Sequence, residues 1–320
     1  MGKKIVGMMS SYPGMNQSDW LWQQTPQPFG AWGNIQMMAQ APEPDFLVMY
    51  QYDFYQKLPQ PKTGWNRLRR SPLIKQVFVE PQVRGLPAER ILYLLREPPL
   101  EEVVAKNRRN YEAAAAYCGY ISGPDQFAPH PEPMPAIWYH GNAFRELNEM
   151  PPPEKVRPLS WITSGIDRTV RHRQRLDFLR LICESGLDCD LYGRNLPDWT
   201  KSWGALDKKW HGMAPYTYNL TVENYADNDL YVTEKLWDAL LAWCLPIYHG
   251  GSAADRLLPP GSFLRLPSLD EKGLAYIREV TATPDAWYEA RAAIAEARQI
   301  ILHKLNLLNW LSEFIQRLSA

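Results

Sequence analysis

The densest group of chemically useful residues lies between positions 216 and 266. There an apolar run ends in the polar pair Glu223-Asn224, a short loop rich in Asn and Asp follows, and Tyr231-Val232-Thr233-Glu234-Lys235 opens a helix. Backbone N–H groups and the positive end of the helix dipole favour an anion at such a helix start. The positive charge of a lysine there is repelled by the helix dipole. A phosphate bound between the Lys235 ammonium and the helix start would remove this repulsion. The alternative is that Lys235 points to solvent and Glu234 is an ordinary first-turn acid.

Two further side chains could complete a site for group transfer. Arg175 stands just before the apolar run at residues 176–179, so it should lie at the edge of the core, where a guanidinium can fork onto a diphosphate. Glu97 follows an apolar run in Arg96-Glu97-Pro98-Pro99, and the proline pair ends the strand and fixes the chain. A carboxylate held in this way is a candidate general base for an alcohol. The alternative is a surface glutamate in a turn.

Metal and simple nucleotide motifs have little support in the sequence. The triplet Asp188-Cys189-Asp190 resembles the acidic triplet that holds Mn²⁺ in one class of glycosyltransferases, but so short a pattern is weak and it alternates like a strand. The six histidines lack the spacing of a zinc site. No G-x-G-x-x-G or Walker loop occurs, which argues against simple NAD and P-loop proteins.

The elements that must position these residues alternate along the chain. We expect strands at residues 4–9, 45–51, 90–95, 118–122, 136–139, 159–163, 189–192, 216–223, 245–248 and 263–266. Helices are expected at residues 108–116, 169–184 and 233–243, with further helices to the end. Short apolar strands that alternate with helices predict an α/β fold with parallel sheets. The triple proline at 151–153 predicts a boundary between an N-terminal domain, 1–153, and a C-terminal domain, 154–320.

The composition favours a soluble globular protein and argues against a nucleic-acid-binding or membrane-spanning one. The chain has 320 residues, 45% of them hydrophobic and 22% charged, as in a soluble globular protein. Basic and acidic residues each number 35, so the net charge of zero argues against a nucleic-acid partner. The four cysteines fit no paired metal-ligand spacing and predict free thiols in a reducing compartment. Neither a signal-peptide core nor about 18 uninterrupted apolar residues occurs. We expect a cytoplasmic protein without an integral membrane segment.

The same segments resemble the α-1,3/4-fucosyltransferases, glycosyltransferase family 10. The signature is carried by Glu223-Asn224, Tyr231-Val232-Thr233-Glu234-Lys235-Leu236, Pro246-Ile247-Tyr248-His249-Gly250-Gly251 and Pro260-Gly261-Ser262-Phe263. The family's order is also followed by Trp161-Ile162-Thr163-Ser164, Arg175-Leu176-Asp177-Phe178-Leu179 and Asp190-Leu191-Tyr192-Gly193-Arg194. Arg96-Glu97-Pro98-Pro99 resembles the loop that holds the family's catalytic glutamate. The similarity covers about residues 90–267.

The resemblance implies a GT-B architecture, with two Rossmann-like domains facing across a cleft. It implies inverting transfer of L-fucose from GDP-fucose to a hydroxyl of a glycan acceptor, in α-1,3 or α-1,4 linkage, with Glu97 as catalytic base. Arg175 and Lys235 would contact the diphosphate and Glu234 the ribose. The donor pocket would also include Glu223, Asn224 and Tyr231. No metal or other cofactor would be required, although a divalent cation could stimulate the reaction.

The loop beside the sugar departs from the family pattern. Asn224 and Tyr231 are one residue further apart than usual, Leu230 replaces the usual aspartate, and Val222 stands where phenylalanine is common. One alternative is therefore the same mechanism with a different nucleotide-sugar donor. A catalytically inactive nucleotide- or carbohydrate-binding protein is another, although a pure binder needs no base such as Glu97. We expect no N-terminal membrane anchor of the animal Golgi type, which would suit a bacterial, cytoplasmic enzyme.

The C-terminal tail, residues 285–318, should be an amphipathic helix. Its apolar residues recur at steps of three and four, while few cations occur after residue 297. Some family members have a basic amphipathic tail that meets the membrane. With so little positive charge, we expect this tail to pack onto the protein's own domains; a position at the periphery of the inner membrane is the alternative.

Overall fold

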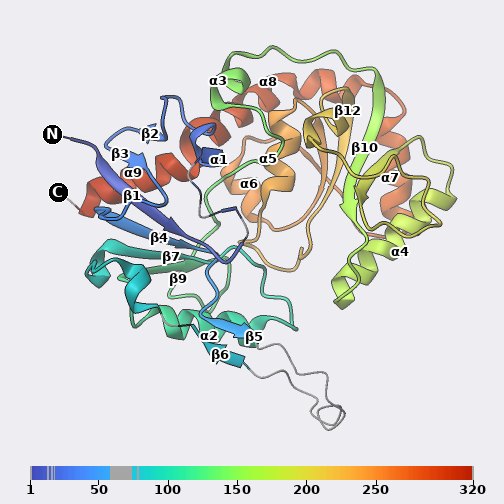
Figure 1. Ribbon diagram of the computed structural model, residues 1–320. Coiled ribbons are helices and arrows are strands. Elements are labelled where there is room, and N and C mark those ends of the chain that lie inside the picture. Colours follow the sequence, from blue (N-terminus) through green and yellow to red (C-terminus); the bar gives the residue numbers. More distant parts are fainter. Residues whose placement is uncertain are drawn as a thin grey trace, which may run out of the picture. The chain divides into compact units, whose positions relative to one another are not determined.

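The computed structural model describes residues 2–12, 14–15, 17, 19–57, 74–77 and 79–318. The chain forms two compact units (Figure 1). The first unit consists of Met1–Trp22 and Phe29–Glu132, and the second of Gln23–Pro28 and Pro133–Ala320. The chain therefore passes from one unit to the other three times. The boundary expected at residues 151–153 instead lies inside the second unit.

The position of the boundary follows from hydrogen bonds made by residues 133–150. Ala136 forms an isolated parallel bridge with Asn306, and the backbone N–H of Tyr139 donates to the Asp238 carboxylate at 2.8 Å. The carbonyl of Leu147 accepts from the buried Arg298 guanidinium. These backbone groups are satisfied by residues much later in the chain, so a proline run after them cannot mark the end of a domain.

The first unit is built on a seven-stranded sheet in the order β2-β3-β1-β4-β7-β8-β9. All its pairs are parallel except β2 with β3. Its strands are β1 (Lys4–Met9), β2 (Ala31–Trp32), β3 (Ile35–Met37), β4 (Phe46–Tyr50), β7 (Ile91–Leu94), β8 (Tyr120–Gly123) and β9 (His130–Pro131). The central strands are nearly all apolar, as strands covered on both faces must be. A separate pair is formed by β5 (Tyr55–Lys57) and β6 (Ile74–Gln76).

The second unit contains a five-stranded, fully parallel sheet in the order β11-β10-β12-β13-β14. Its strands are β10 (Arg157–Ser164), β11 (Asp190–Arg194), β12 (Tyr216–Val222), β13 (Leu245–His249) and β14 (Leu264–Arg265). The first strand of this sheet, β10, lies between β11 and β12, so the chain reverses direction across the sheet at this point. Ligands of doubly wound sheets bind at the carboxyl ends of the strands at such a switch point.

Helices connect the strands of both units. The first unit contains α1 (Asp19–Trp22), α2 (Val104–Ala114) and the short turns η2 (Glu80–Val83) and η3 (Ala88–Arg90). The second contains α3 (Phe144–Glu149), α4 (Val170–Glu184), η4 (Lys209–Gly212), α5 (Glu234–Leu241), α6 (Ala253–Leu257), α7 (Glu271–Thr281), α8 (Asp285–Gln299), η5 (Ile300–Leu305) and α9 (Leu307–Leu318). In the second unit α5 packs on β12, β13 and α8, and α4 packs against α7 (Figure 1). None of the helices in the described ranges is both long and apolar enough to cross a membrane.

The tail forms two helices with a π-helical turn, η5, between them. Its apolar face is buried at Ile301, Leu308, Leu311 and Ile315. The expected packing of the tail onto the protein itself is therefore confirmed. The break falls at Asn306, whose side chain donates to the carbonyl of Gln24 at 2.9 Å.

Candidate active site

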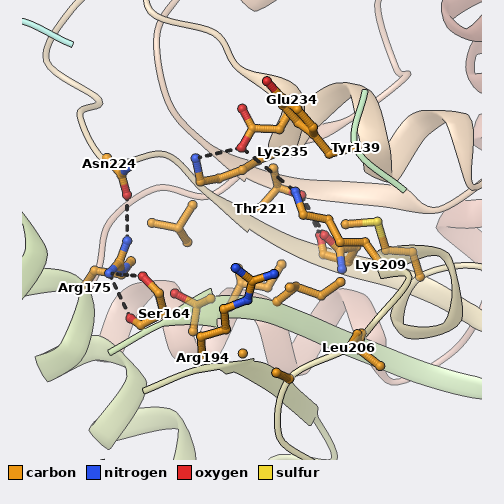
Figure 2. Close-up of a pocket in the computed structure, with 18 of the residues that line it drawn as sticks. Tyr139, Ser164, Arg175, Arg194, Leu206, Lys209, Thr221, Asn224, Glu234 and Lys235 are labelled. Carbon is orange, nitrogen blue, oxygen red and sulfur yellow. Dashed lines mark hydrogen bonds and ion pairs between the residues drawn. The ribbon is translucent and has the colours of Figure 1, made fainter. Parts of the chain in front are cut away.

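A pocket of about 470 Å³ lies in the second unit where the sheet should bind a ligand (Figure 2). Its floor comes from the carboxyl ends of β10, β11 and β12, and α5 begins at its edge. Gly193 lies in this floor with φ +156°, and a Cβ there would come within 1.7 Å of the Thr163 carbonyl oxygen. Only glycine allows β11 to approach β10 so closely at this point.

The start of α5 is fixed by a buried carboxylate. Thr233 caps the helix, and its backbone N–H and hydroxyl donate to the two oxygens of Glu223 at 2.8 and 2.7 Å. The Lys235 ammonium lies 3.3 Å from Glu223 Oε2. Glu223 therefore holds both the cap and the first cation of the helix, although it does not line the pocket itself.

Five charged side chains of alternating sign run from Glu223 to Asp238, and we call them the charge chain. Lys235 lies 3.7 Å from Glu234, Glu234 lies 4.0 Å from Lys209, and Lys209 lies 3.0 Å from the buried Asp238. Lys235, Glu234 and Lys209 line the pocket, whereas Glu223 and Asp238, the two ends of the charge chain, are buried. The charge chain thus holds the ammonium groups of Lys235 and Lys209 at fixed positions on the pocket wall.

Arg175 presents a different kind of charge to the pocket. Its side chain extends from α4 and only 4% of the residue is exposed. One Nη donates to Asn224 Oδ1 at 2.6 Å and the other to the Ser164 carbonyl at 2.9 Å, while Nε has no partner in the described structure. Burial lowers the pKa of Arg175, but a guanidinium keeps its proton in proteins. No carboxylate of the described residues pairs with it, so this end of the pocket favours an anion.

The structure brings together four of the residues predicted from the sequence. Arg175, Asn224, Glu234 and Lys235 all line the pocket. Tyr231 is buried outside the lining, and its backbone N–H donates to Asn228 Oδ1 at 3.0 Å. Glu223 and Tyr231 are thus placed to shape the loop and the helix start rather than to form the pocket wall.

Glu97 belongs to the first unit, directly after β7. The side-chain oxygen of Gln51 accepts from the backbone N–H groups of Arg96 and Glu97 at 2.6 and 3.1 Å. Arg96 in turn donates to the hydroxyl of Tyr50 at 2.6 Å. The end of β4 therefore fixes the backbone on which Glu97 stands, and the side chain is half-buried.

Residues 152–289 match the model for the C-terminal part of glycosyltransferase family 10, the fucosyltransferases. This region is therefore similar in sequence to the fucosyltransferases of that family. It contains every strand of the second sheet and every residue of the pocket except Tyr139.

The chain is also similar to curated fucosyltransferases. The human 3-galactosyl-N-acetylglucosaminide 4-alpha-L-fucosyltransferase is 29% identical over 251 residues, which are 75% of this chain and 58% of the relative. The Drosophila melanogaster alpha-(1,3)-fucosyltransferase C is 42% identical over 76 residues, 22% of this chain and 17% of the relative. The chain thus spans a little over half of the human protein's length.

Solved structures of glycosyltransferases show the same fold. An alpha-glucosyltransferase in complex with UDP and DNA matches with a TM-score of 0.56 at 10% identity, over 100% of both chains. Anabaena HepE in complex with UDP-glucose matches with a TM-score of 0.55 at 12% identity, over 98% of this chain and 99% of that chain. The fold is therefore of the GT-B type, with one parallel α/β sheet in each unit.

Several polar or charged lining residues of the pocket were not predicted as site residues from the sequence. They include Tyr139, Arg194, Asp207 and Lys209. Arg194 had a usable signal, since it directly follows Gly193 at the carboxyl end of a strand. The other three lie in irregular segments or at the start of a short turn, where neither periodicity nor spacing distinguishes a lining residue from a solvated one.

The acidic triplet at 188–190 lies at the start of β11. Asp188 and Asp190 both accept from the Arg157 guanidinium, at 2.8 and 3.1 Å, and Asp190 also accepts from the Tyr216 hydroxyl at 2.8 Å. These carboxylates therefore have a structural role between β10 and β12. Across the residues that the structure describes, no three His, Cys, Asp or Glu side chains form a group that could hold a metal.

Proposed function

We propose that the protein is an inverting fucosyltransferase, which moves L-fucose from GDP-fucose to a hydroxyl of a glycan acceptor in α-1,3 or α-1,4 linkage. The observation that carries the proposal is the buried, uncompensated guanidinium of Arg175, which lines the same pocket as Lys235 in the region similar to family 10. A sugar nucleotide brings a diphosphate, and two cations at a switch point are suited to bind it.

The cations have their largest effect on the leaving group. As the bond between the sugar C1 and the diphosphate oxygen breaks, negative charge grows on the diphosphate, and Arg175 and Lys235 stabilise it. Both are held before the donor arrives, Arg175 by Asn224 and Ser164 and Lys235 by Glu223, so little reorganisation is needed. Their contacts therefore strengthen when the transition state forms.

Glu97 supplies the other half of the mechanism. We propose that its carboxylate takes the proton of the acceptor hydroxyl while that oxygen forms a bond to C1 from the face opposite the diphosphate. One bond forms and one breaks on opposite faces, so the configuration inverts, and the proton stays on Glu97. Glu97 is supported in this role by its position at the carboxyl end of β7 on a backbone fixed by Gln51.

The remaining predicted residues have supporting roles. Glu234 is proposed to accept from the ribose hydroxyls, because it lines the pocket and lies between the two lysines. Asn224 orients Arg175, Glu223 orients Lys235, and Tyr231 closes the loop behind them. We propose that no metal or other cofactor is required, since fixed cations from the chain can neutralise the diphosphate.

The setting of the enzyme is a further part of the proposal. A cytoplasmic location is supported by the four cysteines, all of which are free thiols, and by the buried positions of Cys118 and Cys244. A bacterial source and a peripheral membrane position stay predictions from the sequence alone.

Three variants test the proposal when GDP affinity is measured by calorimetry beside transfer rates from GDP-fucose. Glu97→Gln keeps size but removes the base, so transfer should fall by about 10²- to 10⁴-fold with GDP affinity unchanged. Arg175→Ala and Lys235→Ala should each weaken GDP binding by roughly 10- to 150-fold and reduce transfer further. Glu102→Gln, an exposed glutamate in the same loop, is the matched control. Transfer at the wild-type rate by Glu97→Gln would overturn the assignment of the base.

The donor and the metal requirement are tested by the same assay. With a panel of nucleotide sugars, turnover should be higher with GDP-fucose than with the others. A different preferred sugar would contradict the fucose assignment and would indicate that the altered loop between Val222 and Leu230 changes the donor specificity. EDTA should not abolish turnover. If Mn²⁺ alone restored the rate after EDTA, the proposal of a metal-free mechanism would be wrong.

A further inference from the structure

The pocket of the second unit has two chemically different ends (Figure 2). Arg175, Asn224 and Ser164 form one end, where the guanidinium favours phosphate. Lys209 and Leu206 lie toward the opposite end. Glu234 stands between them, 3.7 Å from Lys235 and 4.0 Å from Lys209. A nucleoside diphosphate with its phosphates at Arg175 and its ribose at Glu234 would therefore place its base toward Leu206 and Lys209.

We propose that Tyr139, Leu206 and Asp207 form the subsite for the nucleobase, and that the Asp207 carboxylate selects guanine. This inference rests on the proposed function, because it assumes that a nucleoside diphosphate occupies the pocket. It goes further by naming the residues that read the base and the edge of the base that they read.

The walls at this end suit a flat heterocycle. Leu206, Ala205 and Met213 contribute apolar surface to the lining. Tyr139 also lines the pocket and is 41% exposed, and the Lys209 ammonium lies 5.6 Å from the centroid of its ring. Bases are commonly held between aromatic and aliphatic side chains, because each has a face that tolerates contact with a π-system.

The two acids of the pocket lining differ in their partners. Glu234 interacts with Lys235 and Lys209. Asp207 makes no hydrogen bond or ion pair through its side chain to any residue in the described ranges, and it is exposed. An ionised carboxylate only accepts hydrogen bonds. Its two oxygens are thus available for a ligand that presents two adjacent donors.

Guanine presents such a pair of donors, the N1–H and the exocyclic 2-amino group. A carboxylate can accept both at once, in the bidentate geometry that makes charge-assisted pairs strong. Adenine has an acceptor nitrogen at the matching ring position and would be repelled. Uracil offers one ring N–H between two carbonyl oxygens, so it satisfies only one oxygen of Asp207. Guanine is accordingly the base that this end of the pocket accepts best.

The test compares GDP, IDP and XDP by calorimetry on the full chain. IDP lacks the 2-amino group, and XDP replaces it with a carbonyl that a carboxylate repels and an amide NH₂ can bind. The wild type should bind GDP about 10-fold more tightly than IDP and far more tightly than XDP. Asp207→Asn should lose roughly 10- to 100-fold in GDP affinity and gain affinity for XDP. Asp198→Asn, an exposed acid of the preceding segment outside the lining, is the matched control and should behave as wild type.

The gain of XDP binding separates base reading from a structural effect, because a misfolded variant would lose both ligands. If Asp207→Asn kept the wild-type preference for GDP over IDP and XDP, the base would lie elsewhere and this inference would be overturned, while the donor proposal would stand. If the wild type bound UDP or ADP more tightly than GDP, the GDP-fucose assignment would fail first, and the guanine subsite with it.

Discussion

Glu223 and Asp238 are both buried carboxylates, and each is compensated by a lysine that reaches the pocket. Arg175 is buried to a similar degree but is surrounded by neutral oxygens. A buried charge that lacks a counterion costs free energy until a ligand supplies one. At the residue scale, the buried carboxylates Glu223 and Asp238 are therefore paired with lysines, whereas the Arg175 guanidinium has no counterion and can bind the donor's diphosphate.

Removal of Lys209 should expose the dependence of Asp238 on its partner. Lys209→Ala leaves a fully buried carboxylate without its cation, so we expect the free energy of unfolding to fall by about 2 to 4 kcal/mol. The double variant Lys209→Ala/Asp238→Asn should be more stable than Lys209→Ala alone, because a neutral amide needs no cation. Urea unfolding of the three proteins measures this. Equal losses in the single and double variants would contradict the role of the ion pair.

His140 predicts a pH dependence of stability. It is fully buried, and burial lowers its pKa to about 4 from an ordinary value of 6.5. The unfolded chain therefore takes up a proton at higher pH than the folded protein does. The stability from neutral His140 is complete above pH 6.5 and is lost as the pH falls toward 4, at about 1.4 kcal/mol per pH unit.

The variant His140→Phe isolates this effect from those of other titrating groups. Between pH 7 and pH 5 the wild type should lose about 2 kcal/mol more of its unfolding free energy than the variant does. Urea unfolding at the two pH values provides the comparison. The edge-to-face contact of His140 with Trp210, at 5.3 Å between ring centroids, can be kept by a phenyl ring. Identical losses in both proteins would show that another group titrates.

At the scale of elements, the start of α5 contributes both to the stability of the protein and to ligand binding. Thr233→Ala removes the cap and leaves Glu223 without the hydroxyl that donates to it at 2.7 Å. We expect a loss of about 1 to 2 kcal/mol in the free energy of unfolding, together with weaker GDP binding, because Glu234 and Lys235 stand in the capped turn. Thr233→Ser should restore both. If serine were as poor as alanine, the methyl group rather than the cap would be responsible.

The strands were predictable because the second sheet is parallel, the first is parallel except for the pair β2 and β3, and their central strands are mainly apolar. Lys4–Met9 was predicted to the residue, and β4, β7, β10, β12 and β13 lie within one or two residues of their predicted ranges. The predicted strand at 136–139 is wrong, since only Ala136 forms a bridge there, with Asn306. That segment is apolar because it is buried, not because it pairs along its length. Burial alone cannot distinguish the two cases from sequence.

The site was predictable to the extent that it is built on regular elements. Arg175, Asn224, Glu234 and Lys235 come from helices or strand ends, and their spacing identified them. Lys209, Asp207 and Tyr139 reach the pocket through tertiary structure that the sequence pattern does not encode. The role of Glu223 could not be predicted either. The sequence shows a polar residue after a strand, but not the three hydrogen bonds that its buried carboxylate accepts.

At the scale of the whole molecule, the units are not consecutive pieces of chain. Residues 23–28 belong to the second unit, although the flanking segments belong to the first. Gln24 donates to the Trp138 carbonyl at 2.7 Å, and the backbone N–H of Phe144 donates to the Gln23 carbonyl at 2.6 Å. A short early segment thus completes the hydrogen bonds of a unit made mainly from residues 133–320.

Two fragments should differ sharply in stability. Residues 133–320 keep the bonds from Tyr139 to Asp238 and from Arg298 to Leu147. Residues 154–320 lose both bonds, so the buried Asp238 and Arg298 each have one hydrogen-bond partner fewer. We expect the longer fragment to fold and bind GDP and the shorter one to aggregate or melt well below it, as measured by circular dichroism and calorimetry. Addition of a peptide spanning residues 20–30 should raise the melting temperature of the longer fragment. A stable 154–320 fragment would support the boundary at the proline run instead.

The hydrogen bond between the Asn306 side chain and the Gln24 carbonyl joins residues 282 positions apart. During translation, Gln24 emerges 282 residues before Asn306, its partner, is made. At about 5 to 20 residues per second this delay is on the order of 15 to 60 seconds. The first unit can assemble in that interval with residues 23–28 looped out of it. Asn306 then binds a segment that was made much earlier, so a pause in synthesis before Asn306 would leave the second unit without this hydrogen bond.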